Sequence, residues 1–159
     1  MAVLPIIADP SPVLRAKAAP VTSFDAALAI LIDDLFETLD AAGGIGLAAP
    51  QVGCSRRVLV MHVPDGNHGR LALINPRLER TAMPAIIEES CLSLPGLTGL
   101  VRRALRVEVS GCTPCGTPQT WQLSDMEAVC AQHEMDHLDG ILFADRLSLW
   151  QRLRRRFAR

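Results

Sequence analysis

Residues 129–140 contain the sequence HEMDH within a run of helix-forming residues. In a helix, residues four apart lie above one another on one face, so His133 and His137 can both reach a single metal ion. Glu134 stands beside the first histidine, where this pattern places the general base of a metal-dependent hydrolase. The histidines share their face with apolar residues, so we expect them to point into the protein. The pattern therefore predicts a buried metal site on a helix.

The start of this helix is marked by the sequence Ser124-Asp125-Met126-Glu127. It predicts a capping box, in which the side chains of Ser124 and Glu127 satisfy backbone N–H groups of the first turn. Apolar residues follow at helical spacing, and Gly140 is expected to end the helix.

A third protein ligand is needed, because a catalytic site of this type has three protein ligands and one open position. In metzincins a third histidine follows six residues after the second, but Phe143 occupies that position. Residues 138–159 contain no glutamate, which excludes the thermolysin-like arrangement. The ligand must lie upstream, unless it is one of the weaker candidates Asp139 and Asp145. A cysteine thiolate is the strongest upstream donor, and the candidates are Cys54, Cys91, Cys112, Cys115 and Cys130.

Length and composition predict one globular domain. The chain has 159 residues, 49% of them hydrophobic, and no apolar run approaches the length of a membrane span. The N-terminus lacks the basic-then-apolar pattern of a signal peptide, so we expect a cytoplasmic protein. An odd number of cysteines, five, fits free thiols or metal ligands better than a disulfide framework.

The C-terminus differs from the rest of the chain in charge. Residues 146–159 carry six of the 16 basic residues and no acidic residue, although the net charge of the whole chain is only −1. Trp150, Leu153 and Phe157 lie on one helical stripe of this segment. One interpretation is a helix that packs this stripe on the body and leaves its arginines in solvent. The other is a contact with a phosphate-rich partner.

The hydrophobic pattern predicts an α+β domain. Four prolines indicate that residues 3–20 run extended, with at most a short turn of helix near Val13 and Leu14. A helix is predicted from Thr22 or Ser23 to the Gly43-Gly44 pair. Strands are predicted at residues 58–61, 71–74, 85–92, 100–110 and 118–123, the first two as an antiparallel pair. We expect the sheet to pack against the HEMDH helix.

Two further groups of metal-binding residue types are interpreted as structural. Cys112 and Cys115 fall at a predicted hairpin tip, and a CxxC pair without a second pair of ligands is more often a plain turn than a zinc site. His62 and His68 fall on a strand and a turn, and we interpret both as structural or solvated.

Three segments, taken together, resemble the motifs of peptide deformylases. They are GIGLAAPQ at residues 44–51, ESCLS at residues 89–93 and QHEMDH at residues 132–137. The similarity extends from the N-terminus to about residue 147. It implies a deformylase-like fold with antiparallel strands around the HEMDH helix, a catalytic domain of residues 1–147, and a basic tail of residues 148–159. It also implies the removal of formyl groups from the N-terminal formylmethionine of new polypeptides, which releases formate.

The resemblance selects one cysteine as the missing ligand. Cys91 matches the family's metal-binding cysteine and would join His133 and His137. Family members use ferrous iron, and zinc, nickel or cobalt can occupy the same ligands. The thiolate neutralises part of the metal's charge, so water at the open position should be less acidic than at a site with histidines alone.

The resemblance also assigns the catalytic groups. Glu134 corresponds to the acid/base, which agrees with its place in the HExxH pattern. Gln51 corresponds to a side-chain donor to the developing oxyanion, and the backbone N–H of Leu92 is its companion.

The substrate pocket is likewise implied by the resemblance. Backbone groups of Ile45, Gly46 and Ser90 are expected to pair with the substrate as an added strand. The residues expected around the methionine side chain are Ile45, Ile87, Met126, Val129 and Cys130.

The chain departs from the family pattern at three positions. Ser90 replaces the glycine that usually precedes the cysteine, which is expected to affect rate or specificity but not metal binding. Gly43 stands where a glutamate often pairs with an arginine, so Arg103 is expected to lack that partner. Thr98 stands where some bacterial members have an arginine that faces the substrate.

Two other functions are compatible with parts of the sequence. A small aminopeptidase or amidase would use the same histidines and Glu134, but it should show a group that binds the charged terminus of its substrate. A peptide-binding protein without activity would be expected to have lost Glu134 or Gln51, and both are present. The expected partners are N-formylmethionyl peptides and, through the basic tail, the ribosome. We expect a monomer that binds neither DNA nor a membrane.

Overall fold

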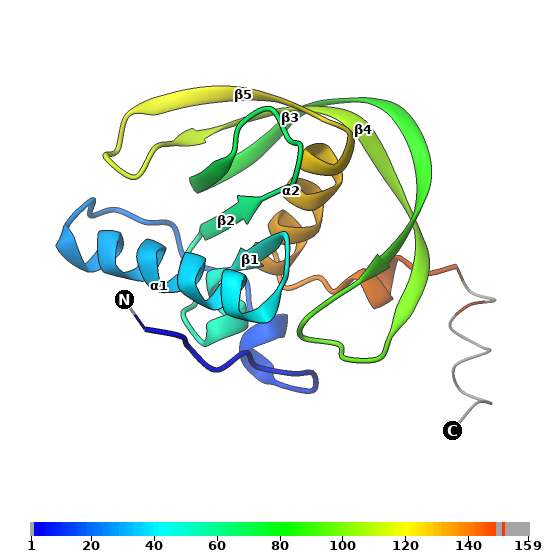
Figure 1. The fold of residues 1–159 in the computed structure, drawn as a ribbon, viewed down its shortest axis with the longest axis horizontal. Coiled ribbons are helices and arrows are strands. Elements are labelled where there is room, and N and C mark those ends of the chain that lie inside the picture. Colours follow the sequence, from blue (N-terminus) through cyan, green and yellow to red (C-terminus); the bar gives the residue numbers. More distant parts are fainter. Residues whose placement is uncertain (1, 149–150, 152–159) are drawn as a thin grey trace.

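The computed structural model describes residues 2–148 and 151, which form two α-helices and one antiparallel sheet (Figure 1). The sheet has five strands in the order β1-β2-β3-β4-β5. The helices are α1 (Ala26–Ala42) and α2 (Asp125–Leu138), and the strands are β1 (Gly46–Ala48), β2 (Val58–His62), β3 (Arg70–Ser90), β4 (Thr98–Cys112) and β5 (Pro118–Ser124). The predicted α+β class, with the HEMDH helix against the sheet, is confirmed. The predicted tail helix falls on residues of which only Ser148 and Gln151 are described.

The middle of the sheet is covered on both faces by helices. Side chains of a strand alternate between its two faces, and all the core residues of β2 are apolar. Val58 and Val60 pack in the cluster that contains the buried side of α1, whereas Leu59 and Met61 pack in the cluster that contains α2. In Figure 1, α2 accordingly lies inside the curve of the sheet. This arrangement buries the helix that carries both histidines.

Strands β3 and β4 are longer than the sequence predicts. Residues 71–74 and 85–92 were expected to be separate strands, but a single strand spans Arg70–Ser90. The ladder with β4 is interrupted by register shifts between Ile74 and Arg77 and between Leu78 and Arg80. These irregularities let the strand bend without ending. The strand stops at Ser90, so Cys91 and Leu92 lie in the turn after it rather than in the predicted strand.

Helix α1 begins at Ala26, three or four residues later than predicted. Its N-cap is Asp25, whose carboxylate accepts a hydrogen bond from the Leu28 N–H at 3.0 Å. A helix begins where a side chain satisfies its first N–H groups, and Asp25 does so instead of Thr22 or Ser23. The predicted end is confirmed, because Gly43 caps the helix with a φ of 64°.

The predicted capping box of α2 is wrong. Ser124 is the N-cap residue, but its side chain makes no capping hydrogen bond. Glu127 instead accepts a hydrogen bond from the His68 N–H at 2.9 Å, and its other oxygen lies 3.0 Å from the His68 ring. A residue from a distant turn therefore binds the first turn of the helix, which sequence spacing alone could not indicate. This contact gives His68 the structural role that was expected of it.

The remaining segments follow the sequence more closely. The N-terminal stretch is extended apart from a 3-10 turn at Pro12–Arg15. Cys112 ends β4 and Cys115 lies in the turn before β5, both as free thiols, so the hairpin-turn interpretation is confirmed. Among the described residues, no helix is long and apolar enough to cross a membrane.

Candidate metal centre

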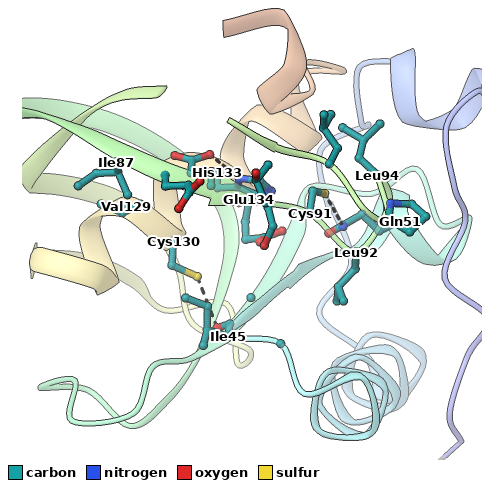
Figure 2. Close-up of a pocket in the computed structure, with 18 of the residues that line it drawn as sticks. Ile45, Gln51, Ile87, Cys91, Leu92, Leu94, Val129, Cys130, His133 and Glu134 are labelled. Atoms are coloured by element: carbon teal, nitrogen blue, oxygen red, sulfur yellow. Dashed lines mark hydrogen bonds and ion pairs between the residues drawn. The ribbon is translucent and has the colours of Figure 1, made fainter. Parts of the chain in front are cut away.

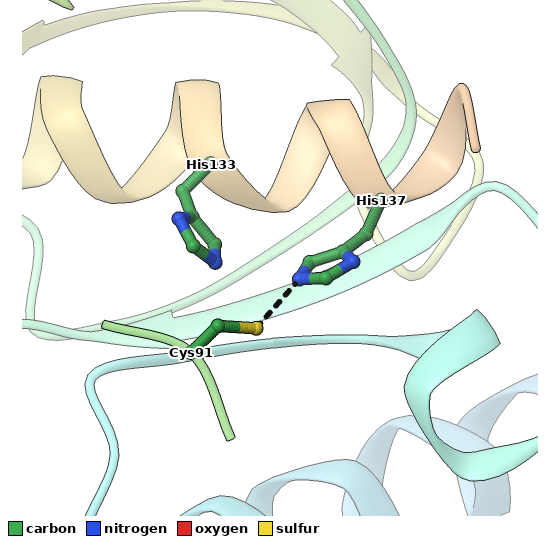
Figure 3. A group of neighbouring side chains, drawn as sticks. All are labelled: Cys91, His133 and His137. Atoms are coloured by element: carbon green, nitrogen blue, oxygen red, sulfur yellow. Dashed lines mark hydrogen bonds between the residues drawn. The ribbon is translucent and has the colours of Figure 1, made fainter. Parts of the chain in front are cut away.

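Cys91, His133 and His137 come together in the buried interior (Figure 3). One nitrogen or sulfur atom from each lies within 4.8 Å of the others, and the Cys91 sulfur is 3.2 Å from Nε2 of His137. The two histidines are one helical turn apart on α2, as the spacing predicted. Cys91 reaches them because it follows the last residue of β3, in a turn closed by a Leu94 N–H to Cys91 carbonyl bond of 2.9 Å.

His133 is held by a buried carboxylate that the sequence analysis did not single out. Nδ1 of His133 donates to Glu89 at 2.8 Å, and Arg103 donates two hydrogen bonds to the same carboxylate. Burial raises the pKa of Glu89, but the hydrogen bonds from His133 and Arg103 outweigh it and lower the pKa to about 2. Glu89 therefore stays ionised and holds a proton on Nδ1 of His133, so Nε2 is the nitrogen that can bind a metal.

Glu134 lies in the interior, with 4% of the residue exposed. Burial raises its pKa to about 7, and its Oε2 atom has no hydrogen-bond partner among the described residues. Gly46 of β1 passes so close that a Cβ atom there would lie 2.6 Å from Glu134 Oε1. The glycine is required by this close approach of strand to helix. A buried carboxylate with such a pKa and a free oxygen is suited to accept and return a proton near neutral pH.

Gln51 is oriented by its neighbours. Its Oε1 accepts from the Ala48 N–H at 2.8 Å, so the amide nitrogen faces the other way, toward Ser93 Oγ at 3.2 Å and the Cys91 sulfur at 3.7 Å. Within the described part of the chain, the backbone N–H of Leu92 has no acceptor. Two N–H donors are thus placed beside the cysteine.

These groups line one cavity of about 620 Å³ (Figure 2). Gln51, Cys91, Leu92, His133 and Glu134 are on its wall. All residues that the sequence analysis expected around the substrate also line it, namely Ile45, Gly46, Ile87, Ser90, Met126, Val129 and Cys130. The other apolar side chains on the wall come from the turn between β3 and β4, namely Leu94, Pro95 and Leu97.

Comparison with known proteins identifies the family. The family model for polypeptide deformylase matches residues 3–153. A peptide deformylase of Acidothermus cellulolyticus is 50% identical over 152 residues, which are 96% of this chain and 83% of that protein. The chain belongs to the polypeptide deformylase family. It is therefore a metal-dependent hydrolase that removes the formyl group from the N-terminal formylmethionine of nascent polypeptides and releases formate.

Solved deformylase structures have the same fold. A peptide deformylase from Legionella pneumophila superposes with a TM-score of 0.91 at 38% identity. The superposed region is 98% of this chain and 92% of the Legionella chain. One from Acinetobacter baumannii, bound to Met-Ala-Ser, superposes with a TM-score of 0.87 at 32% identity, over 92% and 99% of the two chains.

The donor set of this deformylase fits the metal that the family requires. One thiolate and two imidazoles suit borderline-soft divalent ions such as Fe²⁺, Zn²⁺, Ni²⁺ and Co²⁺. Cys91 and both histidines are each at most 9% exposed as whole residues. Burial lowers the pKa of His133, but hydrogen bonds with Cys91 and Glu89 outweigh it and raise the pKa to about 10. A metal ion therefore has to displace a proton to bind there, as is general for histidine ligands.

As expected, Arg103 has no glutamate partner at position 43, but two other carboxylates pair with it. Gly43 offers no side chain, but Arg103 is fully paired, with Glu89 on one side and with Asp136 at 2.7 Å on the other. The alternation of β3 could have pointed to Glu89, because it falls on the same inward face as Ile87 and a buried carboxylate needs partners. Nothing in the sequence spacing points to Asp136. The other departures, Ser90 and Thr98, are exposed at the cavity and lie opposite each other in the β3–β4 ladder.

Proposed function

We propose that Cys91, His133 and His137 hold one divalent metal ion, ferrous iron, at which this deformylase cleaves formyl peptides. The observation that carries the proposal is that these three ligands meet within 4.8 Å beside the unpartnered oxygen of Glu134. When bound, the metal supplies positive charge that activates water and polarises the formyl carbonyl. The remaining steps are assigned to the protein's own groups.

Glu134 is the proposed acid/base. Its free Oε2 accepts the proton of the attacking water, and because burial raises its pKa it can return that proton to the departing amine nitrogen. The amide N–H of Gln51 and the backbone N–H of Leu92 are proposed to bind the oxyanion that forms on the formyl carbon. Both are fixed before the reaction, so they stabilise the transition state without reorganising.

The apolar part of the cavity is proposed to hold the methionine side chain of the substrate. Ile45, Ile87, Met126, Val129 and Cys130 provide a wall without charge. Backbone groups of Ile45, Gly46 and Ser90 would pair with the peptide as an added strand. The Met-Ala-Ser tripeptide carried by the relative from Acinetobacter baumannii supports this kind of ligand.

X-ray absorption at the iron edge of anaerobically purified protein tests the ligand set. We expect one sulfur and two imidazole nitrogens around iron, and loss of the sulfur in Cys91→Ser. A spectrum without sulfur in the unmodified protein would refute the assignment of Cys91.

The ferrous form is expected to be sensitive to oxygen. Air or peroxide should inactivate it by oxidising the metal or the Cys91 thiolate, while a nickel-substituted form should survive because Ni²⁺ does not readily change oxidation state. The measurement is the half-life of peptide hydrolysis in air for both forms. Equal half-lives would contradict iron as the labile partner.

Ser90→Gly is expected to raise kcat/KM for formyl peptides and leave metal content unchanged. Ser90 is exposed at the cavity, and it is not among the residues with positive φ, so a glycine is not required there for backbone geometry. The change removes only a side chain beside the proposed peptide strand, so an effect of up to about tenfold, or about 1.4 kcal/mol, is expected. Ser90→Ala is the matched control, because it keeps Cβ and removes the hydroxyl. Unchanged rates for both variants on several peptides would show that this side chain does not meet the substrate.

The arginine-rich C-terminus is proposed to contact ribosomal RNA. Its support is the concentration of six arginines within residues 146–159 of a chain with a net charge of −1. We also propose that the protein acts as a monomer in the cytoplasm, and its five cysteines, all free thiols, are compatible with that compartment.

Deleting residues 151–159 is expected to weaken co-sedimentation with ribosomes and to leave hydrolysis of a short formyl peptide nearly unchanged. Binding of the full-length protein should also fall as salt is added, because contacts with phosphates release counterions. A full-length variant separates the loss of charge from the loss of length, because it keeps every residue position. Its five arginines are replaced by glutamine, at Arg152, Arg154, Arg155, Arg156 and Arg159, and it should bind ribosomes as weakly as the truncated protein. If the truncated protein sediments as well as the intact one, the tail has no part in ribosome binding.

A further inference from the structure

A chain of charged groups leads from the metal centre to the surface. It begins at His133, whose Nδ1 donates to Glu89 at 2.8 Å. Arg103 binds both oxygens of that carboxylate, at 2.6 and 3.0 Å, with its Nε and Nη2 atoms. The third guanidinium nitrogen, Nη1, donates to Asp136 at 2.7 Å. Arg103 therefore bridges two carboxylates and is itself 4% exposed.

The chain ends at Arg146. Its Nε and Nη2 atoms donate to the two oxygens of Asp136, in a bidentate pair that is the strongest geometry for these groups. One oxygen of Asp136 thus accepts from both arginines. The side chain of Arg146 is 41% exposed, whereas those of Arg103, Glu89 and Asp136 are below 10%.

When His133 is a neutral metal ligand, the charges of Glu89, Arg103 and Asp136 balance only if Arg146 is counted. Glu89 and Asp136 carry two negative charges in the interior, and Arg103 carries one positive charge between them. Arg146 supplies the second positive charge. Without it, Asp136 would be left half-paired, and Arg103 would be drawn from Glu89 toward Asp136. The carboxylate that holds His133 would then lose part of its own support.

We propose that Arg146 is a positioning residue for the metal centre, acting on His133 through Asp136, Arg103 and Glu89. The proposal rests on the assignment of His133 as a metal ligand. Groups that orient a histidine ligand through its second nitrogen usually change metal affinity by ten- to a hundredfold when removed. Arg146 is more distant than those groups, so an effect at the lower end, about tenfold, is expected.

A purely structural role is the alternative. Arg146 ends the 3-10 turn Phe143–Arg146, so its pair with Asp136 could do no more than fasten this turn to α2. The two roles differ in what they change. Fastening affects the stability of the fold, whereas positioning affects the metal's ligand geometry in a protein that is fully folded.

The test compares Arg146→Met with Arg146→Lys and Arg15→Met. Arg15 is the matched control, because it makes exposed ion pairs with Asp145 and Asp9 next to the same turn without touching the buried chain. The readouts are the rate at which a chelator removes zinc from the loaded protein and the visible spectrum of the cobalt form. We expect Arg146→Met to lose zinc about tenfold faster and to shift the cobalt spectrum. Arg146→Lys should lose zinc more slowly than Arg146→Met. Arg15→Met should change neither the rate of zinc loss nor the cobalt spectrum.

A double-mutant cycle tests whether Arg146 acts through Glu89. In a Glu89→Gln background, Arg146→Met should add little to the rate of zinc loss, because the path is already broken. Equal zinc loss and identical cobalt spectra for Arg146→Met and the unmodified protein would overturn the proposal, as would full additivity in the cycle. Failure of the ligand assignment is recognised separately, because Cys91→Ser would then leave the X-ray absorption spectrum of the bound metal unchanged.

Discussion

Replacing Glu134 with glutamine is expected to reduce formate release by about a hundredfold or more, while the metal and the fold remain. Glu134 is adjacent to a ligand but is not one of the three residues that converge at the site. Glutamine has nearly the same shape and cannot carry the proton between water and the leaving amine. The measurement is kcat/KM for a formyl peptide, with metal content determined on the same sample.

Glu127→Gln is the matched control for this variant. It is the same substitution on the same helix, at a buried residue that binds His68 and does not line the cavity. We expect it to lower the thermal midpoint and to leave kcat almost unchanged. If Glu134→Gln is isolated without metal, or retains most of its activity, the acid/base assignment is wrong.

The pH dependence of the reaction follows from the same residue. Burial raises the pKa of Glu134 to about 7, and a cation held at the ligands favours the carboxylate and lowers this pKa. A base works in its deprotonated form, so kcat/KM should rise with pH along a limb whose midpoint lies below pH 7. The residual kcat/KM of Glu134→Gln should not show this rise with pH.

Replacing Arg103 with methionine is expected to destabilise the fold by about 3–5 kcal/mol, as is typical when one partner of a buried ion pair is removed. The variant leaves the carboxylates of Glu89 and Asp136 buried with too little positive charge. Unfolding by urea measures the effect. Arg15→Met removes an arginine from exposed ion pairs and should cost no more than about 1 kcal/mol.

The acid sensitivity of stability should change in the same variant. In the unmodified protein the pKa of Glu89 falls from 4.5 to about 2 on folding. Its contribution is therefore fully present above pH 4.5 and is lost as the pH falls toward 2. Without Arg103 this pKa should rise, so the stability lost between pH 4.5 and 2 should shrink. A variant as stable as the unmodified protein, with the same acid profile, would contradict this account of the buried charges.

The parts of the site that lie on one element could be predicted from the sequence. Helical spacing was sufficient to place His133 and His137 on one buried face, because periodicity is a local property. The choice of Cys91 among five cysteines needed the family resemblance, since its contact with the helix depends on where β3 ends. The pocket residues on β3 and α2 were predicted in the same way, and all of them line the cavity.

The contacts that support the site could not be predicted. Asp136 and Arg146 are ten residues apart and Arg103 is far from both, so only the curvature of β3 and β4 around α2 brings the three together. The N-cap residue Ser124 was predicted correctly, but the capping hydrogen bonds of α2 were not, because Glu127 binds His68 rather than its own helix. Local sequence patterns predict contacts between residues close in sequence, whereas these side chains bind residues of other elements.

This deformylase is proposed to use a metal at Cys91, His133 and His137 to cleave formyl groups from peptides. Anaerobically purified protein should release formate from formyl-Met-Ala-Ser and leave acetyl-Met-Ala-Ser nearly untouched. A chelator should abolish the reaction, and returning Fe²⁺ or Ni²⁺ should restore it. Comparable hydrolysis of the acetyl peptide, or formate release that survives complete removal of the metal, would contradict the claim.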